Sequence, residues 1–149
     1  MINLKDLARQ HKSINTKFHA AIAFELKKAG EHGERYVFQK PDFVRRTGEL
    51  QKATTHKVVK TKSGRVYALK MRNPKKYAAA IDKGAKAHRI TARRRKALRF
   101  QVGGQLVFRK SVMHPGNRPR RFLYRATQSA GGVFHQAMLL QMERIAKAR

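Results

Sequence analysis

A single helical stripe dominates the first fifth of the chain and limits how the chain can fold. Apolar residues and one histidine recur there at spacings of three and four, which is the period of one helix face, at Leu4, Leu7, His11, Ile14, Phe18, Ile22 and Leu26. Asn3 can cap this helix, and Asp6 falls in its first turn, where a carboxylate is favourable. Gly30 and Gly33 are expected to end it, so a helix is predicted over residues 1–33. A helix of about seven turns with one apolar face needs a partner, either a sheet or a copy of itself.

The middle of the chain has the features of short strands joined by tight turns. Residues 36–51 are predicted as a loop. Partly alternating polarity over residues 56–61 and 65–71, joined by Lys62-Ser63-Gly64, predicts a β-hairpin. A second hairpin is predicted from residues 97–102 to residues 105–110, with Gly103-Gly104 as its two-residue turn.

The remaining segments complete an α+β fold. Asn73-Pro74 is expected to start a short helix over residues 77–83 that stops at Gly84, followed by a basic loop over residues 86–96. Residues 113–119 are predicted as a turn, and residues 121–149 as a helix that Gly131-Gly132 kinks or splits. A length of 149 residues fits one domain. We therefore predict a small, mainly antiparallel β-sheet over residues 43–125, packed by a long N-terminal helix and a C-terminal helix.

Charge is the most unusual property of the composition, and it is unevenly distributed. The chain has 36 Lys and Arg against 8 Asp and Glu, a formal net charge of +28. Residues 1–50 have a net charge of +4 and residues 51–149 a net charge of +24, with no carboxylate from residue 83 to residue 142. Such a balance predicts a polyanionic partner rather than a particular fold. No apolar run exceeds five residues, against about 20 needed to span a bilayer, and residues 1–6 lack a secretory signal, so no membrane partner is expected.

The cations that are candidates for contact with DNA or another polyanion fall in two runs. Neutralising the phosphate backbone is their natural use, since solubility alone does not require so many cations without a carboxylate. No recognition helix, zinc finger or ribonucleoprotein-type aromatic motif is present, so sequence-specific binding is not indicated. The candidates are Lys83, Lys86, Arg89, Arg93, Arg94, Arg95, Lys96, Arg99, Arg118, Arg120 and Arg121.

Catalytic and cofactor sites are not indicated. The chain has no cysteine, which excludes a disulfide framework, a thiol nucleophile and cysteine-based metal sites. Its carboxylates are scattered, its histidines lack metal-ligand spacing, and its glycine pairs do not form a phosphate-binding loop, so no cofactor and no metal are expected. His11 is expected in the half-buried core, and His88 and His114 in turn hydrogen bonds. A small basic ribonuclease that uses His88 or His114 is a remaining alternative.

The order of several landmarks resembles a family of tailed-bacteriophage proteins. Residues 44–50, which contain Thr47, Gly48 and Leu50, resemble its R-T-G-x-L segment. Residues 77–90, with Tyr77, Gly84 and His88, resemble its Y-A-x-x-[VI]-E-x-G-T-x-x-H-x-I segment, with Asp82 for the usual Glu and Ala85 for the usual Thr. Residues 112–123 resemble V-x-H-P-G-x-x-x-x-P-F-L, with Arg120-Arg121 where a proline often precedes the phenylalanine; the matching residues are His114, Pro115, Gly116, Phe122 and Leu123.

The chain thus resembles, over roughly residues 43–130, the head–tail joining, or neck and tail-completion, proteins of long-tailed phages. The resemblance implies a non-enzymatic structural protein of the virion neck, present in the host cytoplasm during assembly. It implies a homo-oligomeric ring, with six copies expected, that touches the connector or adaptor and the tail tube or terminator proteins. Viral double-stranded DNA would pass through the ring lumen, and at least part of residues 83–99 is expected to face it. The motif residues are expected to be structural.

Besides the ribonuclease, two alternatives remain at this point. The first is a tail terminator, which has the same fold as the neck proteins of this family. The second, of another class, is a free-standing, sequence-independent nucleic-acid-binding protein in which the charge alone determines the function.

Overall fold

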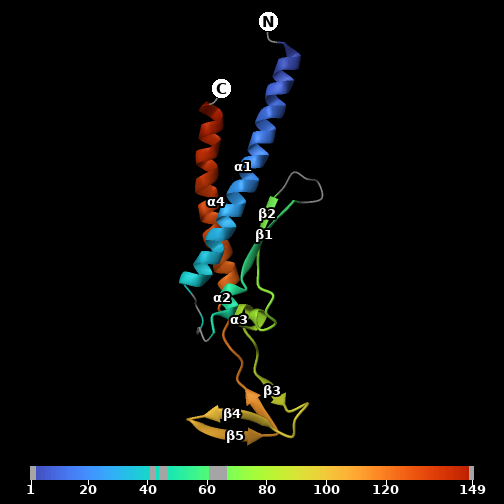
Figure 1. Ribbon diagram of the computed structural model, residues 1–149, viewed down its shortest axis with the longest axis vertical. Helices are drawn as coiled ribbons and strands as arrows, with labels where there is room; N and C mark the ends of the chain where they lie inside the picture. Colours follow the sequence, from blue (N-terminus) through green and yellow to red (C-terminus); the bar gives the residue numbers. More distant parts are fainter. Residues whose placement is uncertain (1–2, 41–42, 44–46, 61–66, 148–149) are drawn as a thin grey trace. The chain divides into compact units, whose positions relative to one another are not determined.

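The computed structural model describes residues 3–40, 43, 47–60 and 67–147, and it confirms the α+β class (Figure 1). The residues cluster in two compact units. Unit 1 comprises the described parts of Met1–Lys75 and Phe122–Arg149, and unit 2 comprises Lys76–Arg121, which is inserted in the sequence between them. The predicted sheet consists of three two-stranded antiparallel sheets, one in unit 1 and two in unit 2.

Helix α1 (Leu4–Gln39) begins as the sequence predicts but does not end where the glycines are. The side chain of Asn3 accepts a hydrogen bond from the Lys5 backbone N–H (3.0 Å), which caps the helix. The prediction that Gly30 and Gly33 end α1 is wrong: both are buried inside the helix, which continues to Gln39. The predicted loop over residues 36–51 is correspondingly shorter, and its last residues belong to α2 (Glu49–Lys52).

The two helical glycines instead allow close packing. A Cβ at Gly30 would overlap the imidazole ring of His56, and a Cβ at Gly33 would lie 3.2 Å from the backbone oxygen of Ala126. A glycine within a helical pattern lowers helix propensity, but here the absence of a side chain is what lets neighbouring elements approach. The same residue type that often ends a helix is therefore used for packing in α1.

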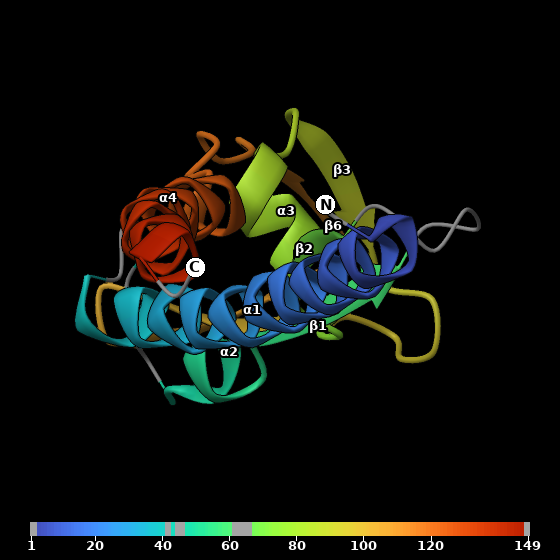
Figure 2. The same ribbon diagram turned by 90° about the horizontal axis from the view of Figure 1, so that it is seen from above.

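Helices α1 and α4 (Phe122–Lys147) cross in unit 1 through small residues. Figure 1 shows the two helices side by side, and in Figure 2 α4 is seen nearly end-on while α1 runs across the view. Ala29 of α1 and Ala126 and Ala130 of α4 have no exposed surface, as expected where helix backbones approach closely. Polar pairs bridge the helices on either side of this contact: His32 Nε2 lies 3.0 Å from Ser129 Oγ, and Gln141 Nε2 donates to Glu25 Oε1 (2.9 Å).

Helix α4 passes through Gly131-Gly132 without a break, so the predicted split is wrong. Both glycines are exposed, and a Cβ at either position would meet nothing within 4 Å. Each glycine costs about 1 kcal/mol of helix propensity relative to alanine. The same helix buries Ala130 and Met138, and this packing offsets the cost of the two glycines.

The first predicted hairpin is present as β1 (Thr55–Lys60) paired with β2 (Tyr67–Arg72), with Val58 opposite Leu69. Its connection at residues 61–66 lies outside the described residues. Strand β1 is tied to α1 because the backbone N–H of His56 donates to Glu34 Oε1 and His56 Nδ1 lies near the same oxygen, both at 2.8 Å. This double contact positions the imidazole ring that lies against Gly30.

Replacing Gly30 with alanine is expected to destabilise unit 1 by up to about 2 kcal/mol. Overpacking a core costs about 1–3 kcal/mol, and the gain in helix propensity returns only about 1 kcal/mol. The matched control is Gly131→Ala, the same substitution where the added methyl group is free of contacts, which is expected to stabilise by about 0.5–1 kcal/mol. Urea denaturation followed by circular dichroism measures both. Equal effects of the two variants would contradict the packing role of Gly30.

Unit 2 is built from a short helix and two nested hairpins. Helix α3 (Ala78–Lys83) begins four residues after Pro74, not at it, and ends at Gly84 as predicted. Strand β3 (His88–Thr91) pairs with β6 (Ser111–His114), and between them β4 (Leu98–Val102) pairs with β5 (Gln105–Arg109). The second predicted hairpin and its Gly103-Gly104 turn are confirmed.

Two loop predictions in unit 2 are wrong in part. The predicted basic loop at residues 86–96 contains β3, and the predicted turn at residues 113–119 starts within β6. All four residues of β3 are exposed, so the strand has no buried alternate positions that periodicity could detect. It exists because its backbone pairs with a strand about twenty residues later, from His88 opposite His114 to Thr91 opposite Ser111.

Unit 2 has almost no buried core of its own. Across residues 76–121, all of which are described, Ala78 is the one buried hydrophobic residue. Large apolar side chains are exposed on its surface instead: Tyr77, Ile90, Val102, Leu106, Phe108 and Met113. A two-stranded hairpin without a buried face is only marginally stable in water. The unit therefore has apolar surface that is available for burial against a partner.

Candidate nucleic-acid interface

The cations predicted to contact a polyanion all lie in unit 2, and each of them is exposed. This unit has 14 Lys and Arg against the single carboxylate of Asp82. Arg89 lies on β3 and Arg99 on β4, while Lys83 ends α3. The others lie in the connections, four of them between β3 and β4. The structure sorts most of them into two groups.

The first group, here called the base cluster, lies at the open end of the β4–β5 hairpin. The loop from β3 to β4 and the end of β5 meet there, because Leu98 pairs with Arg109 and the Ala92 N–H donates to the carbonyl oxygen of Lys110 (3.1 Å). None of these cations forms an ion pair with any described residue. The base cluster consists of Arg93, Arg94, Arg95, Lys96, Arg109 and Lys110.

Arg109 and Lys110 join the base cluster through pairing that the sequence does not display. They are 13 or more residues from Lys96 along the chain, and only the register of β4 and β5 brings them next to it. Six exposed cations without an ion-pair partner among the described residues, at one end of one hairpin, make a concentrated site for phosphate groups.

The second group, here called the junction cluster, surrounds the link between α3 and the segment after β6. Ala85 and Asn117 exchange backbone hydrogen bonds of 3.0 and 2.9 Å, and the backbone N–H groups of Arg120 and Arg121 donate to the carbonyl oxygens of Ile81 and Asp82. The backbone pairing thus gathers cations from two distant segments. The junction cluster consists of Lys83, Lys86, Arg118, Arg120 and Arg121.

Arg121 has an unusual backbone conformation. Its φ of 51° makes it the one non-glycine residue with positive φ in the described part of the chain. This conformation costs an L-residue about 1–2 kcal/mol, and proline, whose ring fixes φ near −65°, cannot adopt it. This backbone conformation just before α4 therefore excludes proline at position 121, where the phage motif often has one.

His88 and His114 face each other across the β3–β6 ladder, with ring centroids 5.1 Å apart. The predicted turn hydrogen bonds are present: His88 Nδ1 lies 2.9 Å from the carbonyl oxygen of Lys86, and His114 Nδ1 accepts from the Gly116 N–H (3.0 Å). Acceptance at Nδ1 fixes the proton of a neutral His114 on Nε2. Both rings thus help to shape the turns next to the junction cluster.

The remaining motif residues have structural positions. Gly48 (φ 74°) precedes α2, where Thr47 Oγ1 accepts from the Glu49 N–H and Leu50 is buried. Gly84 and Gly116 also have positive φ, and a Cβ at Gly116 would overlap the backbone of Ala85. The other positions range from buried to exposed: Phe122 is buried, Leu123 is half-buried, and Tyr77 and Pro115 are exposed.

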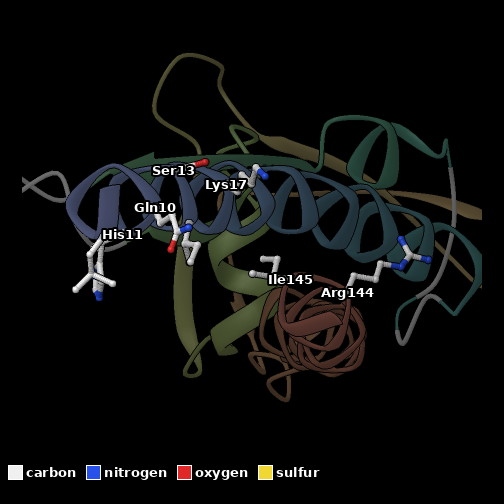
Figure 3. Close-up of a pocket in the computed structure, with 8 residues that line it drawn as sticks. Gln10, His11, Ser13, Lys17, Arg144 and Ile145 are labelled. Atoms are coloured by element: carbon white, nitrogen blue, oxygen red, sulfur yellow. The ribbon is translucent and has the colours of Figure 1, made fainter. Parts of the chain in front are cut away.

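A groove in unit 1 lies between the first half of α1 and the end of α4 (Figure 3). Its volume is about 720 Å³, its apolar wall comes from Leu7, Ile14 and Ile145, and polar side chains such as Lys17 and Arg144 line the rest. The prediction that His11 is half-buried in the core is wrong, because His11 is exposed in this groove. Leu4 and Leu7 are also exposed, so the apolar stripe of α1 extends beyond its contact with α4.

No group of three or more histidine and carboxylate side chains that could hold a metal ion is present among the described residues. No helix in the described ranges is long and apolar enough to cross a bilayer. No family model, no curated protein and no solved structure matches this chain.

Proposed function

We propose that this protein is a structural component of a phage neck, which joins or completes the tail at the head–tail interface and contacts DNA through unit 2. The observation that supports this most is the convergence of the phage-like motif segments. Residues 77–90 and 112–123 resemble the same family in order, and in the structure they form one hydrogen-bonded assembly. His88 pairs with His114, and Ala85 pairs with Asn117.

The backbone conformation of two glycines explains how the two motif segments come so close together. Each motif contains one glycine, Gly84 or Gly116, and both glycines have positive φ, a conformation that favours glycine. A Cβ at Gly84 would lie 2.9 Å from the Asn117 carbonyl oxygen, so the two segments approach as closely as their backbones allow. Motif residues that fit together in this way are expected when the resemblance reflects a shared fold rather than chance.

The exposed apolar surface supports an assembly rather than a free monomer. Apart from Leu106 and Phe108, unit 2 exposes Tyr77, Ile90, Val102 and Met113, and the groove in unit 1 has an apolar wall. Subunits of a ring with heterologous contacts bury such surfaces against neighbouring copies. The net charge of +28 repels those copies, and DNA in the lumen would offset this repulsion.

The second candidate is a sequence-independent nucleic-acid-binding protein that works outside a virion. The concentration of 14 cations against one carboxylate in unit 2 favours it, because this alone suffices for binding phosphate backbones. The two candidates differ in their oligomeric state without nucleic acid. A neck subunit forms or joins a ring, whereas the second candidate stays monomeric after nuclease treatment.

The deciding experiment is negative-stain microscopy of lysates after a stop codon replaces Lys5 in the phage genome that encodes this chain. We expect filled heads that lie apart from tails, since joining fails when the neck is incomplete. Tails of abnormal length would point instead to a terminator of the same fold. Normal infectious virions would overturn the neck function. Light scattering on the purified, nuclease-treated protein then reports whether a monomer remains.

A further inference from the structure

The β4–β5 hairpin presents two different faces. Paired residues share a face, so Leu98, Phe100 and Val107 lie together on one side and are half-buried, while Val102, Gln105 and Arg109 on the same side are exposed. The other face contains two cross-strand pairs, Arg99 with Phe108 and Gln101 with Leu106. All four of these side chains are exposed, and Phe108 retains 55% of its accessible surface.

Phe108 is therefore an aromatic ring that unit 2 leaves open to a ligand. No aromatic or cation–π contact involves its ring among the described residues. Side chains directly opposite on paired strands have Cβ atoms about 4.5–5.5 Å apart, so the Arg99 guanidinium is within reach of a group stacked on Phe108. Lys110 of the base cluster lies two residues after Phe108, whereas Arg109 pairs with Leu98 and so lies on the opposite face of the hairpin.

An exposed ring beside cations, in a unit with a single carboxylate, is suited to one chemistry in particular. Proteins that bind single-stranded nucleic acid stack unpaired bases on aromatic side chains and bind the flanking phosphates with nearby cations. In a duplex the base faces are stacked on one another, so a ring on a flat ribbon cannot reach them without opening the helix. A purely apolar protein partner would leave Arg99 and the base cluster without counter-charges.

We propose that the Arg99–Phe108 face of the β4–β5 hairpin binds single-stranded nucleic acid, with one unpaired base stacked on Phe108 and its flanking phosphates bound by Arg99 and by the cations of the base cluster other than Arg109. This inference rests on the proposed contact with DNA and specifies the form of DNA that the hairpin selects. The duplex is bound through phosphate contacts alone, and the single strand gains the stacking contact in addition.

The test compares a labelled 12-nucleotide single strand with the matching 12-base-pair duplex by fluorescence anisotropy over a series of salt concentrations. The protein is the full chain after nuclease treatment. Phe108→Ala is expected to weaken single-strand binding roughly 5- to 150-fold, the range found when a stacking aromatic is truncated. Its effect on duplex binding is expected to stay within about twofold. The slope of log affinity against log salt is expected to be unchanged for both ligands, because no phosphate contact is removed.

Two matched variants make the result specific. Leu106→Ala removes an apolar side chain of similar exposure (49%) from the same face and is expected to change single-strand affinity less than about twofold, since only an aromatic ring stacks. Phe108→Trp is expected to retain binding, and because the chain has no tryptophan, quenching of the new indole fluorescence by the single strand reports stacking directly.

Distinct outcomes would overturn this inference without affecting the neck function. Equal losses of single-strand and duplex affinity in Phe108→Ala, an equal loss in Leu106→Ala, or an unquenched tryptophan each contradict base stacking. The microscopy of the Lys5 stop variant is independent of these measurements, so a neck protein that binds duplex DNA without selecting single strands would be recognised as such.

Discussion

Replacing Arg93, Arg94, Arg95 and Lys96 together with alanine is expected to weaken duplex DNA binding by roughly 10³-fold at about 0.15 M salt. Each phosphate contact contributes about 0.9 to the slope of log affinity against log salt, so the slope is expected to fall by about three to four. All four side chains are exposed in the loop between β3 and β4 and have no ion-pair partner among the described residues. Their loss therefore removes phosphate contacts without removing internal ones, and Tm is expected to change little.

The control removes the same charge from unit 1. Lys5, Lys12, Lys27 and Lys57 are exposed on α1 and β1, and the sequence-based candidates include none of them. Their joint replacement with alanine lowers the net charge equally but is expected to change the salt slope by less than about one. Fluorescence anisotropy over a salt series measures both variants. If the two slopes fell equally, total charge rather than the base cluster would determine binding.

The sequence correctly predicts the elements that are determined by residues close together in the chain. The β4–β5 hairpin is an example, since Gly103-Gly104 and the alternation that places Phe100 between Arg99 and Gln101 specify both the turn and the face. The start of α1 is another, because the Asn3 cap acts over two residues. In both cases all interacting groups are close in sequence.

Glycine and strand β3 show where local patterns stop being sufficient. Position 30 of α1 is a glycine because the ring of His56, 26 positions later in the chain, fills the space that a side chain would need. The periodicity of the helix does not reveal this contact. Strand β3 has four exposed residues and is defined by a partner strand alone. Long-range pairing is determined by tertiary structure, which overrides local preference.

The candidate site also combines features that the sequence predicts with features that depend on the fold. Composition predicts a cationic segment, because charge can be counted without knowing the fold. It does not predict that Arg109 and Lys110 join the loop cations, nor that Phe108 shares a face with Arg99, since both depend on the register of β4 and β5. The exposure of His11 likewise depends on the end of α4, whose Ile145 lines the same groove.

Replacing Phe122 with alanine is expected to produce the largest loss of stability, about 3–5 kcal/mol. Phe122 is the first residue of α4, retains 2% of its accessible surface, and packs edge-to-face against Phe43 with ring centroids 5.2 Å apart. Truncation loses the transfer free energy of the ring and leaves a cavity at the start of the helix. Since 1 kcal/mol shifts Tm by several degrees in a chain of this size, Tm is expected to fall by roughly 10–20 °C, as measured by calorimetry.

Tyr124 provides the matched control, because it is an aromatic residue of the same helix with an exposed ring whose hydroxyl group accepts from Gln128 Nε2 (2.7 Å). Tyr124→Ala is expected to cost no more than about 0.5 kcal/mol, the range for exposed positions. Phe122→Leu keeps most of the buried apolar volume and is expected to cost less than half as much as Phe122→Ala. If Tyr124→Ala lost as much stability as Phe122→Ala, burial of the aromatic ring at the first turn of α4 would not be what stabilises unit 1. The order expected from burial is Phe122→Ala, then Phe122→Leu, then Tyr124→Ala, because the three variants remove progressively less buried surface.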